Sequence, residues 1–461
     1  MRISFLFIFI VFVIFGCNNH SSNSQKENLN EDSIAPQGIK NGVLNLMTAQ
    51  SDPNCRYGLY IPKDSCNLYP LIVIFDPHAA GNHAASQYQE LADKYKIVLA
   101  ASNNIQNNMA SDQFVYFANC VISDVMDMVS IDSNYVYLMG FSGGARVASY
   151  IAQSENVFRG VIGCGAGIGE ITNVHTSGFL YIGFAGYSDF NFSEVYKTEN
   201  VLRQSPIRAH FKYFEGKHEW PPDTIMEYAF AAIELDRKND ISINVKPYIS
   251  KELIFCKNIP IRDAWKKVVN YKSLKDILEI STGFENENLK INGYLPGYEA
   301  KTAERALNNS LTSEAKSQLE FQKAFTEKDI DWWTKKVSIL NSAREKKDKS
   351  PADYRDIRLL SYISMSCYML TSSALKNEDL KQTEKYLSIY RNADAMNPDV
   401  AYFNAVYLSF TGNYKEAIDT LTMSINRGFS DKGKWRSEKA FIPLKDSLRF
   451  IDLESKLNAI P

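Results

Sequence analysis

A serine flanked by glycines is the residue whose setting points most directly to chemistry. Ser142 lies in Gly140-Phe-Ser-Gly-Gly144, which ends an apolar run and begins an amphipathic stretch. A strand that passes through such a turn into a helix holds its serine in a strained conformation with the hydroxyl exposed, an arrangement called a nucleophile elbow. The alternative is the glycine turn of a nucleotide-binding fold, but Ser142 replaces the second glycine of G-x-G-x-x-G and no phosphate-loop lysine follows. We therefore interpret Ser142 as a nucleophile.

A serine hydroxyl attacks near neutral pH only when a base takes its proton, so a histidine is needed. His218 lies in Gly216-Lys-His-Glu-Trp-Pro-Pro222, between an expected last strand and last helix. His210 begins an expected strand, where a structural role fits better. The remaining histidines lie before any suitable acid: His20, His78, His83 and His175. We predict that His218 is the base, although prolines at a helix start also explain this loop without catalysis.

A carboxylate must orient the imidazole and stabilise its charged form. Asp189 is the first carboxylate after the apolar run Phe179 to Phe184, on a loop before an expected helix. A helix cap is the alternative role for Asp189, and Glu194 is a weaker candidate for the acid.

An oxyanion needs two N–H donors, one from the residue after the nucleophile and one from a loop after an earlier strand. Gly143 supplies the first. For the second we predict the backbone of Ala79 or of a neighbour, since Pro77 has no N–H. His78 either lines an acyl pocket or has a structural role.

Together these segments resemble the α/β-hydrolase superfamily, closest to esterases related to polyhydroxybutyrate depolymerases, feruloyl esterases and dienelactone hydrolases. The likeness covers roughly residues 45 to 235 and rests on these motifs: Tyr57-Gly-Leu-Tyr-Ile-Pro62, the Asp76-Pro-His78 loop, Gly140 to Arg146, Gly186 to Asn191 and Gly216 to Pro222. One departure is His78-Ala79 where relatives often have His-Gly. The resemblance implies hydrolysis of a carboxylic ester, small or glycan-linked, through an acyl-enzyme without metal or organic cofactor. The alternative hypotheses for the function are a non-catalytic binding or scaffold protein and a serine peptidase.

The chain begins with a pattern typical of export. An apolar run from Phe5 to Phe15 follows Arg2 and is shorter than the ~20 residues of a membrane-spanning helix. It closes on Gly16-Cys17, which resembles a lipobox, so residues 1–17 are predicted to be a lipoprotein signal peptide with Cys17 lipidated. We expect an exported protein held on a bacterial membrane, periplasmic or at the cell surface, with residues 18–41 as a flexible tether. A cleaved secretory signal with an incidental cysteine is the alternative.

Residues 42–238 alternate short apolar runs with amphipathic stretches, which predicts a mostly parallel sheet wrapped by helices. The expected strands are Arg56 to Ile61, Leu71 to Asp76, Ile97 to Ala101, Tyr135 to Gly140, Gly160 to Cys164, Phe179 to Phe184 and His210 to Phe214. The expected helices are Ala84 to Tyr95, Gln113 to Val129, Gly144 to Gln153, Asn191 to Arg203 and Asp223 to Leu235.

After this α/β part we expect a polar linker over residues 239–260 and an all-helical domain over 261–461. Its expected helices are Trp265 to Leu278, Ala303 to Ala324, Asp331 to Arg344, Tyr354 to Leu375 and Leu380 to Met396. Seven later residues match the spacing of a tetratricopeptide repeat, with a plain helical hairpin as the alternative: Ala405, Leu408, Gly412, Tyr414, Ala417, Leu421 and Ser424. Such a domain is a possible docking surface for a protein partner.

The composition of the chain argues against nucleic acid as a partner and against a metal site built from cysteines. The chain has 461 residues and a net charge of −2, so it lacks the basic field that gathers nucleic acid. Its cysteines show no metal-binding spacing. Cys55 and Cys66 could close a short loop, but scattered buried thiols explain them as well, so the sequence assigns no disulfide.

Overall fold

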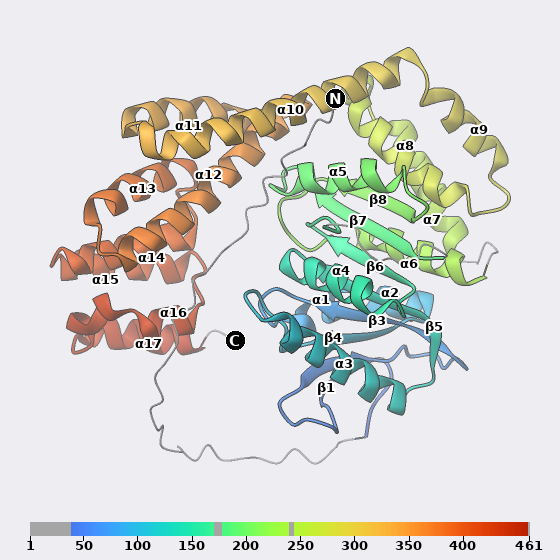
Figure 1. Cartoon of the computed structure of the whole chain (residues 1–461), viewed down its shortest axis with the longest axis horizontal. Coiled ribbons are helices and arrows are strands. Elements are labelled where there is room, and N and C mark those ends of the chain that lie inside the picture. Colours follow the sequence, from blue (N-terminus) through green and yellow to red (C-terminus); the bar gives the residue numbers. More distant parts are fainter. Residues whose placement is uncertain (1–37, 170–177, 239–243, 460–461) are drawn as a thin grey trace, which may run out of the picture. The chain divides into compact units, whose positions relative to one another are not determined.

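The protein is described here by a computed structural model covering residues 38–169, 178–238 and 244–459 (Figure 1). The expected signal peptide, Cys17 and nearly all of the expected tether lie outside these residues. No helix in the part of the chain that the structure covers is long and apolar enough to cross a membrane. Six cysteines lie in that part, and all are free thiols.

An eight-stranded sheet forms the centre of the first half. Its strands lie in the order β1-β2-β4-β3-β5-β6-β7-β8, antiparallel from β1 to β4 and parallel from β4 to β8. Their bounds are β1 Leu44–Thr48, β2 Arg56–Tyr60, β3 Tyr69–Phe75, β4 Val98–Ser102, β5 Ile131–Phe141, β6 Gly160–Cys164, β7 Leu180–Gly186 and β8 Arg208–Phe214. The predicted mostly parallel sheet is confirmed, and every expected strand is present within a few residues.

The strand that the sequence pattern did not reveal is β1. It is short, lies at the edge of the sheet and has no fully buried residue, so its apolar pattern is weak. The central strand β3 shows the opposite case, because all its residues are buried. Leu71, Val73 and Phe75 belong to one core while Ile72 and Ile74 belong to the other, as the two-residue period of a strand requires.

Helices cover both faces of this sheet (Figure 1). Their bounds are α1 Gly81–Gln87, α2 Gln89–Tyr95, α3 Ser111–Met128, α4 Gly143–Glu155, α5 Phe192–Leu202 and α6 Asp223–Lys238. One helix was expected over Ala84 to Tyr95, but the chain bends at Tyr88, whose buried hydroxyl donates to the Pro221 carbonyl at 2.7 Å. This bond ties the bend to the loop that carries His218.

The expected linker over residues 239–260 is largely a packed helix. Residues 245–258 form α7 (Val245–Asn258), and Tyr248, Ile249 and Cys256 are buried in the core on one face of the sheet. Its lysines lie among apolar residues at helical spacing, which the polar composition of the segment obscured. A chain cut at residue 238 would therefore lose part of the core that covers the sheet.

The next helices also complete the α/β half. They are α8 (Ala264–Leu278), preceded by the short 3-10 helix η1 (Ile261–Asp263), then α9 (Glu285–Tyr294) and α10 (Tyr298–Glu327). Lys212 of β8 is 2% exposed at its side chain and donates to Glu252 of α7 and Asn270 of α8. Because a buried ammonium needs partners, the sheet depends on residues beyond the expected boundary at 238.

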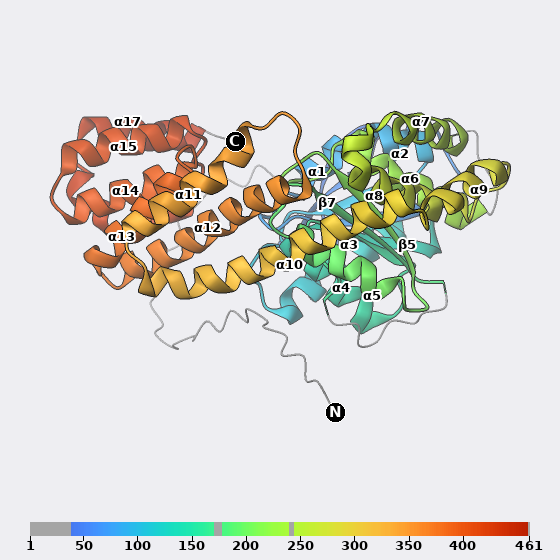
Figure 2. The ribbon, with the colours of Figure 1, turned by 90° about the horizontal axis from the view of Figure 1, so that it is seen from above.

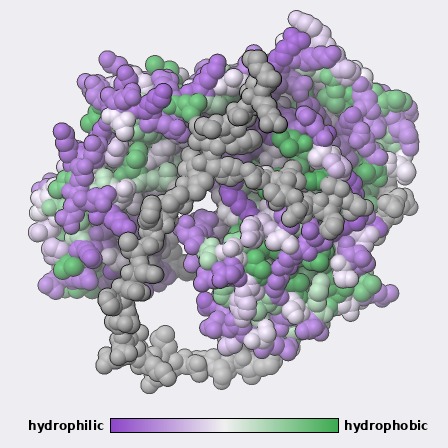
Figure 3. Space-filling view, in the orientation of Figure 1, coloured by the Kyte–Doolittle hydropathy of each residue, from purple (hydrophilic) through white to green (hydrophobic). Residues whose placement is uncertain are grey.

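A second, all-helical region follows. It contains α11 (Ile330–Glu345), α12 (Pro351–Lys376), α13 (Leu380–Ala393), α14 (Pro398–Phe410), α15 (Tyr414–Asn426), α16 (Lys432–Ser437), η2 (Lys439–Leu444) and α17 (Leu448–Ala459). These helices share a core of their own with the last turns of α10. Helices α14 and α15 form a hairpin whose turn contains Gly412 at φ 78°. Hydrophilic and apolar residues are interspersed on the face shown in Figure 3.

One long helix links the two halves, as Figure 2 shows for α10. Its first turns supply Ala300, Ala303 and Leu307 to a core of the sheet, and its end supplies Phe321 and Phe325 to the helical core. The halves therefore share a continuous helix in place of a flexible linker.

A buried ion pair lies near the middle of this helix. The Arg358 guanidinium of α12 donates to Glu314 of α10 through Nε and Nη2, at 2.6 to 3.1 Å, and both side chains are 1% exposed. Through Nη1 it also donates to the carbonyl of Tyr187, at 2.8 Å. Because one guanidinium bonds both to Glu314 and to Tyr187, it fixes α10, α12 and the loop after β7 to one another.

We expect Arg358→Met to lower the free energy of unfolding by about 3 kcal/mol or more, because Glu314 would stay buried without a counter-charge. Adding Glu314→Leu should recover most of the loss. Urea denaturation measures both. In the matched control Arg449→Met, which breaks an exposed pair with Asp419, the change should stay below about 1 kcal/mol. A loss in the Arg358 variant no larger than in the control would show that the pair does not hold the halves together.

Candidate active site

The turn between β5 and α4 places Ser142 as the sequence predicts. Ser142 has φ 51° and ψ −114°, a strained conformation for a residue with a side chain. A Cβ atom on Gly140 would lie 2.2 Å from the Gly144 carbonyl, and one on Gly144 would lie 2.1 Å from the Phe75 carbonyl. Both glycines are therefore needed for strand, turn and helix to pack this closely.

The three residues selected from the sequence meet at the carboxyl edge of the sheet. His218 Nε2 lies 2.9 Å from the Ser142 hydroxyl oxygen, and His218 Nδ1 lies 2.9 Å from Asp189 Oδ1. Ser142 comes from the end of β5, Asp189 from the loop after β7 and His218 from the loop after β8. With Nδ1 protonated toward the carboxylate, Nε2 is free to accept the serine proton.

Two aromatic rings hold the imidazole between them. The Phe141 ring centroid lies 4.6 Å from that of His218 and the Phe190 centroid lies 4.2 Å from it, with interplanar angles near 40°. The His218 side chain is 19% exposed, so one edge remains open to a substrate. Neither phenylalanine was assigned a role from the sequence, although each adjoins a predicted site residue.

Asp189 is almost completely buried. Its Oδ1 accepts from His218 and from the backbone N–H of Asn191 at 2.8 Å, while Oδ2 has no hydrogen-bond partner among the described residues. Burial raises the pKa of Asp189 above its ordinary value, against the opposing effect of His218. The Asn191 side chain donates to the Gly165 carbonyl at 2.8 Å and so fixes the loop in place.

The alternative acid, Glu194, is engaged elsewhere. Its carboxylate accepts from Arg146 at 2.6 and 3.0 Å and from the Gly167 backbone at 3.0 Å. Burial raises the pKa of Glu194, but these hydrogen bonds outweigh it and leave the pKa below its usual value. The geometry therefore favours Asp189 over Glu194 as the partner of His218.

The expected oxyanion donor at Ala79 needs correction. Its N–H already donates to the carbonyls of Ile105, at 3.1 Å, and Asp76, at 3.3 Å. The cause is a pairing between the loops after β3 and β4, which also includes a bridge from His78 to Gln106. In this structure Ala79 has no N–H left for a substrate, because the amide holds the two loops together.

Gly143 lies at the position where the sequence predicts a first N–H donor. It is the first residue of α4, where backbone N–H groups have no partner within the helix. The amide of Asn107 lies against it, since a Cβ atom on Gly143 would come 1.9 Å from Asn107 Oδ1. Sequence reasoning missed Asn107, which follows β4 by a few residues and belongs to no recognised motif.

The loop after β8, which carries His218, is bonded to the loop after β3. Asp76 Oδ2 accepts from the indole N–H of Trp220 at 2.9 Å, and Oδ1 accepts from the backbone of His78 at 2.9 Å. The His78 side chain is 77% exposed with its Nδ1 3.6 Å from Asp76 Oδ1, and this partner raises the pKa of His78. Burial raises the pKa of Asp76, but the hydrogen bonds outweigh it and the pKa is lowered.

Helices α8 and α12 contact the loop after β7, which carries Asp189. Besides the bond from Arg358 to its carbonyl, Tyr187 accepts at its hydroxyl from Asn270 of α8, at 3.1 Å. Its ring packs on Trp265 and Tyr354, with centroids 4.9 and 5.6 Å away. Because Tyr187 is two residues before Asp189, these contacts help to set the position of Asp189.

The strand order, the elbow and the order Ser, Asp, His along the chain agree with one architecture. The chain has the α/β-hydrolase fold. No group of histidine, cysteine and carboxylate side chains in the described residues could hold a metal ion. The arrangement is suited to transferring a proton from a serine hydroxyl to an imidazole.

Comparison with known proteins finds only distant likenesses. No family model and no curated protein matches the chain. Among solved structures, a fluorophosphonate-binding serine hydrolase of Staphylococcus aureus covers 42% of this chain and 97% of its own, at 11% identity and a TM-score of 0.35. A carboxylesterase of Bacillus cereus covers 41% and 97%, at 13% identity and a TM-score of 0.33. A ferulic acid esterase covers 42% and 96%, at 13% identity and 0.33. Likenesses this low do not indicate a function, and the chain's own geometry is the better guide to its chemistry.

We expect Asp76→Asn to destabilise the protein by about 1–3 kcal/mol near neutral pH, because the carboxylate is hydrogen-bonded in the folded state. The folded pKa of Asp76 is lowered, so its contribution is present above the unfolded pKa and is lost as pH falls through the folded value. Because His78 also gains its charge beside Asp76 below about pH 6.5, the comparison starts at about pH 5. From there to about pH 3 the gap in melting temperature between parent and variant should narrow. The control is Asp127→Asn, an exposed carboxyl on α3. A gap that widens between about pH 5 and about pH 3 would contradict this role.

Proposed function

We propose that this chain is a serine hydrolase that cleaves carboxylic esters through an acyl-enzyme. The observation that carries the proposal is the continuous hydrogen-bonded chain from the Ser142 hydroxyl through His218 to the buried Asp189. A serine in an elbow with positive φ, next to a base held by an acid, is the arrangement that activates a hydroxyl for acyl transfer. Nucleotide binding does not require these three side chains to meet.

In the acylation step, Ser142 Oγ attacks the ester carbonyl carbon while its proton moves to His218 Nε2. The tetrahedral intermediate collapses as the bond from carbon to the alcohol oxygen breaks, and His218 returns the proton to the leaving alcohol. Asp189 keeps Nδ1 protonated and stabilises the imidazolium. Water then attacks the acyl-serine in the same way, which releases the acid and restores Ser142.

The charge that develops on the carbonyl oxygen needs donors near the elbow. We place Gly143 N–H as the first, since it begins α4 and the helix N-terminus favours negative charge. For the second donor we propose a backbone N–H of the loop after β3 other than that of Ala79, which is already bonded.

The test is Ser142→Ala. We expect hydrolysis of a short-chain p-nitrophenyl ester to fall about a thousandfold or more and labelling by a fluorophosphonate probe to disappear, with folding preserved. The matched control is Ser154→Ala, an exposed serine of α4, which should leave turnover and labelling unchanged. Equal turnover by Ser142→Ala and the parent would remove Ser142 from the mechanism.

The two carboxyl candidates can be separated in the same assay. We expect Asp189→Asn to lower kcat by about a thousandfold or more, since an amide cannot hold the required imidazole tautomer. Glu194→Gln should cost much less, because Glu194 pairs with Arg146 and not with His218. The reverse ranking would transfer the acid role to Glu194.

Two further proposals start from sequence patterns. We propose that Cys17 is lipidated and anchors an exported protein to a bacterial membrane, with residues 18–41 as a tether. We also propose that α14 and α15 form a tetratricopeptide-like repeat through which the helical region binds a protein partner.

A further inference from the structure

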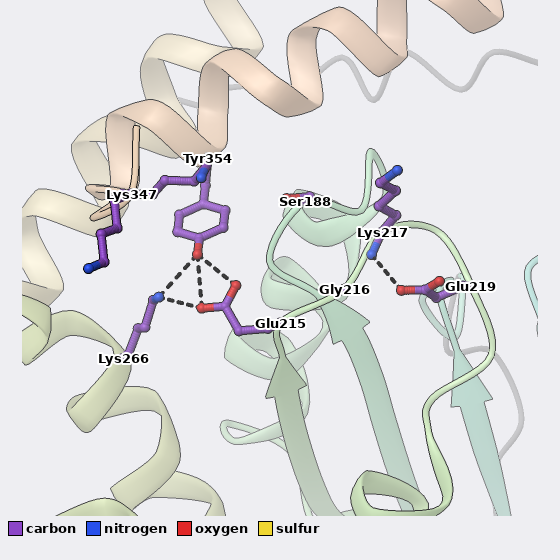
Figure 4. A pocket seen from close by; sticks show the side chains of 9 residues that line it. Ser188, Glu215, Gly216, Lys217, Glu219, Lys266, Lys347 and Tyr354 are labelled. Carbon is purple, nitrogen blue, oxygen red and sulfur yellow. Dashed lines mark hydrogen bonds and ion pairs between the residues drawn. The ribbon is translucent and has the colours of Figure 1, made fainter. Parts of the chain in front are cut away.

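A crevice of about 450 Å³ opens beside the acid and base loops (Figure 4). Ser188 and Lys217 line one side, from the loops after β7 and β8. Lys266 of α8 and two lysines of the loop before α12, Lys347 and Lys349, line the other. We call this space the lysine crevice. Ser188 precedes Asp189 and Lys217 precedes His218, so its wall is one residue, or about 3.8 Å along the chain, from two members of the proposed triad.

The lining carries an excess of positive charge. Four lysines and two glutamates are among the residues that line the crevice. Glu215 is neutralised within the wall, because it binds the Lys266 ammonium and accepts from the Tyr354 hydroxyl at 2.7 and 2.9 Å (Figure 4). Glu219 accepts from the backbone N–H of Lys217, which does not neutralise it, so the lining keeps three lysines against one carboxylate.

The acids next to the crevice are already paired with other cations. Asp348 pairs with Arg262 at 3.1 Å, and Asp353 pairs with Lys346 at 2.6 Å. No ion pair involves Lys217, Lys347 or Lys349 in the part of the chain that the structure describes. Since the whole chain carries a net charge of −2, this local excess is opposite in sign to the overall charge.

The lysines of the helical region are held in place beside the loops. Tyr354 follows their loop by a few residues and bonds to Glu215 of the base loop. Arg358, one turn further on, bonds to the acid loop at the Tyr187 carbonyl. Because these contacts are buried or half-buried, the far wall of the crevice keeps a fixed position relative to His218.

We propose that the lysine crevice binds an anionic group of the substrate, so that the enzyme prefers esters bearing a carboxylate or a phosphate at a distance from the scissile bond. This inference rests on the proposed ester hydrolysis and names its substrate class. Unpaired cations in a crevice raise the local concentration of an anionic substrate and bind its charge. The helical region thereby supplies part of the specificity of the hydrolase half.

The test compares pairs of esters that differ in one charge. For the acyl side the pair is the p-nitrophenyl monoester of a dicarboxylic acid and the p-nitrophenyl alkanoate of the same length. For the alcohol side it is para-acetoxybenzoate and para-acetoxybenzamide, with para-acetoxyphenyl phosphate to separate carboxylate from phosphate. In at least one pair we expect kcat/KM to favour the anionic ester, by a ratio that falls as ionic strength rises.

The double variant Lys347→Ala with Lys349→Ala should lower kcat/KM for the preferred anionic ester by about three- to tenfold and leave the neutral ester unchanged. The matched control is Lys415→Ala, an exposed lysine of α15, which should change neither. Equal kcat/KM within every pair, or an equal loss for both members in the double variant, would overturn this inference while ester hydrolysis stood. If no ester turned over and the fluorophosphonate probe did not react, the proposed function and this inference would both fail.

Discussion

The site depends on the backbone strain at Ser142. A positive φ at a residue with a side chain is unfavourable, and it persists because β5, the turn and α4 are packed too closely to relax. Gly140 and Gly144 permit that approach, and the strain turns the hydroxyl out of the sheet toward His218. With the nucleophile fixed in this way, the loops after β7 and β8 have only to bring an acid and a base to one point.

Those loops are fixed by contacts from far along the chain. Trp220 bonds to Asp76 behind the base, while Arg358 and Asn270 hold Tyr187 beside the acid. The helical region is therefore part of what positions the proposed triad. The continuous helix α10 between the halves agrees with this coupling, since it contributes residues to a core of each half.

Much of the site could be predicted because its residues lie in local motifs in a fixed order. Ser142, Asp189 and His218 each follow an apolar strand, and parallel strands bring such positions to one edge. Ala79 could not be judged in this way, since the use of its N–H depends on a pairing between two loops. Arg358 acts through a contact with the distant Tyr187, which no local pattern reveals.

The helices and strands also divide into those that the sequence pattern reveals and those that it does not. Strands buried on both faces gave strong signals, while the exposed edge strand β1 and the polar helix α7 gave weak ones. The Lys212 ammonium illustrates why domain boundaries are hard to predict, because its partners Glu252 and Asn270 lie beyond the boundary that composition suggested.

The most direct measurement of the central claim is the site of covalent reaction with a fluorophosphonate. Intact-mass analysis of the full chain after treatment, followed by peptide mapping, should find one phosphonyl group on the Ser142 hydroxyl, with none added after heat denaturation. An adduct on another serine, or an unmodified folded protein after prolonged treatment, would contradict the account.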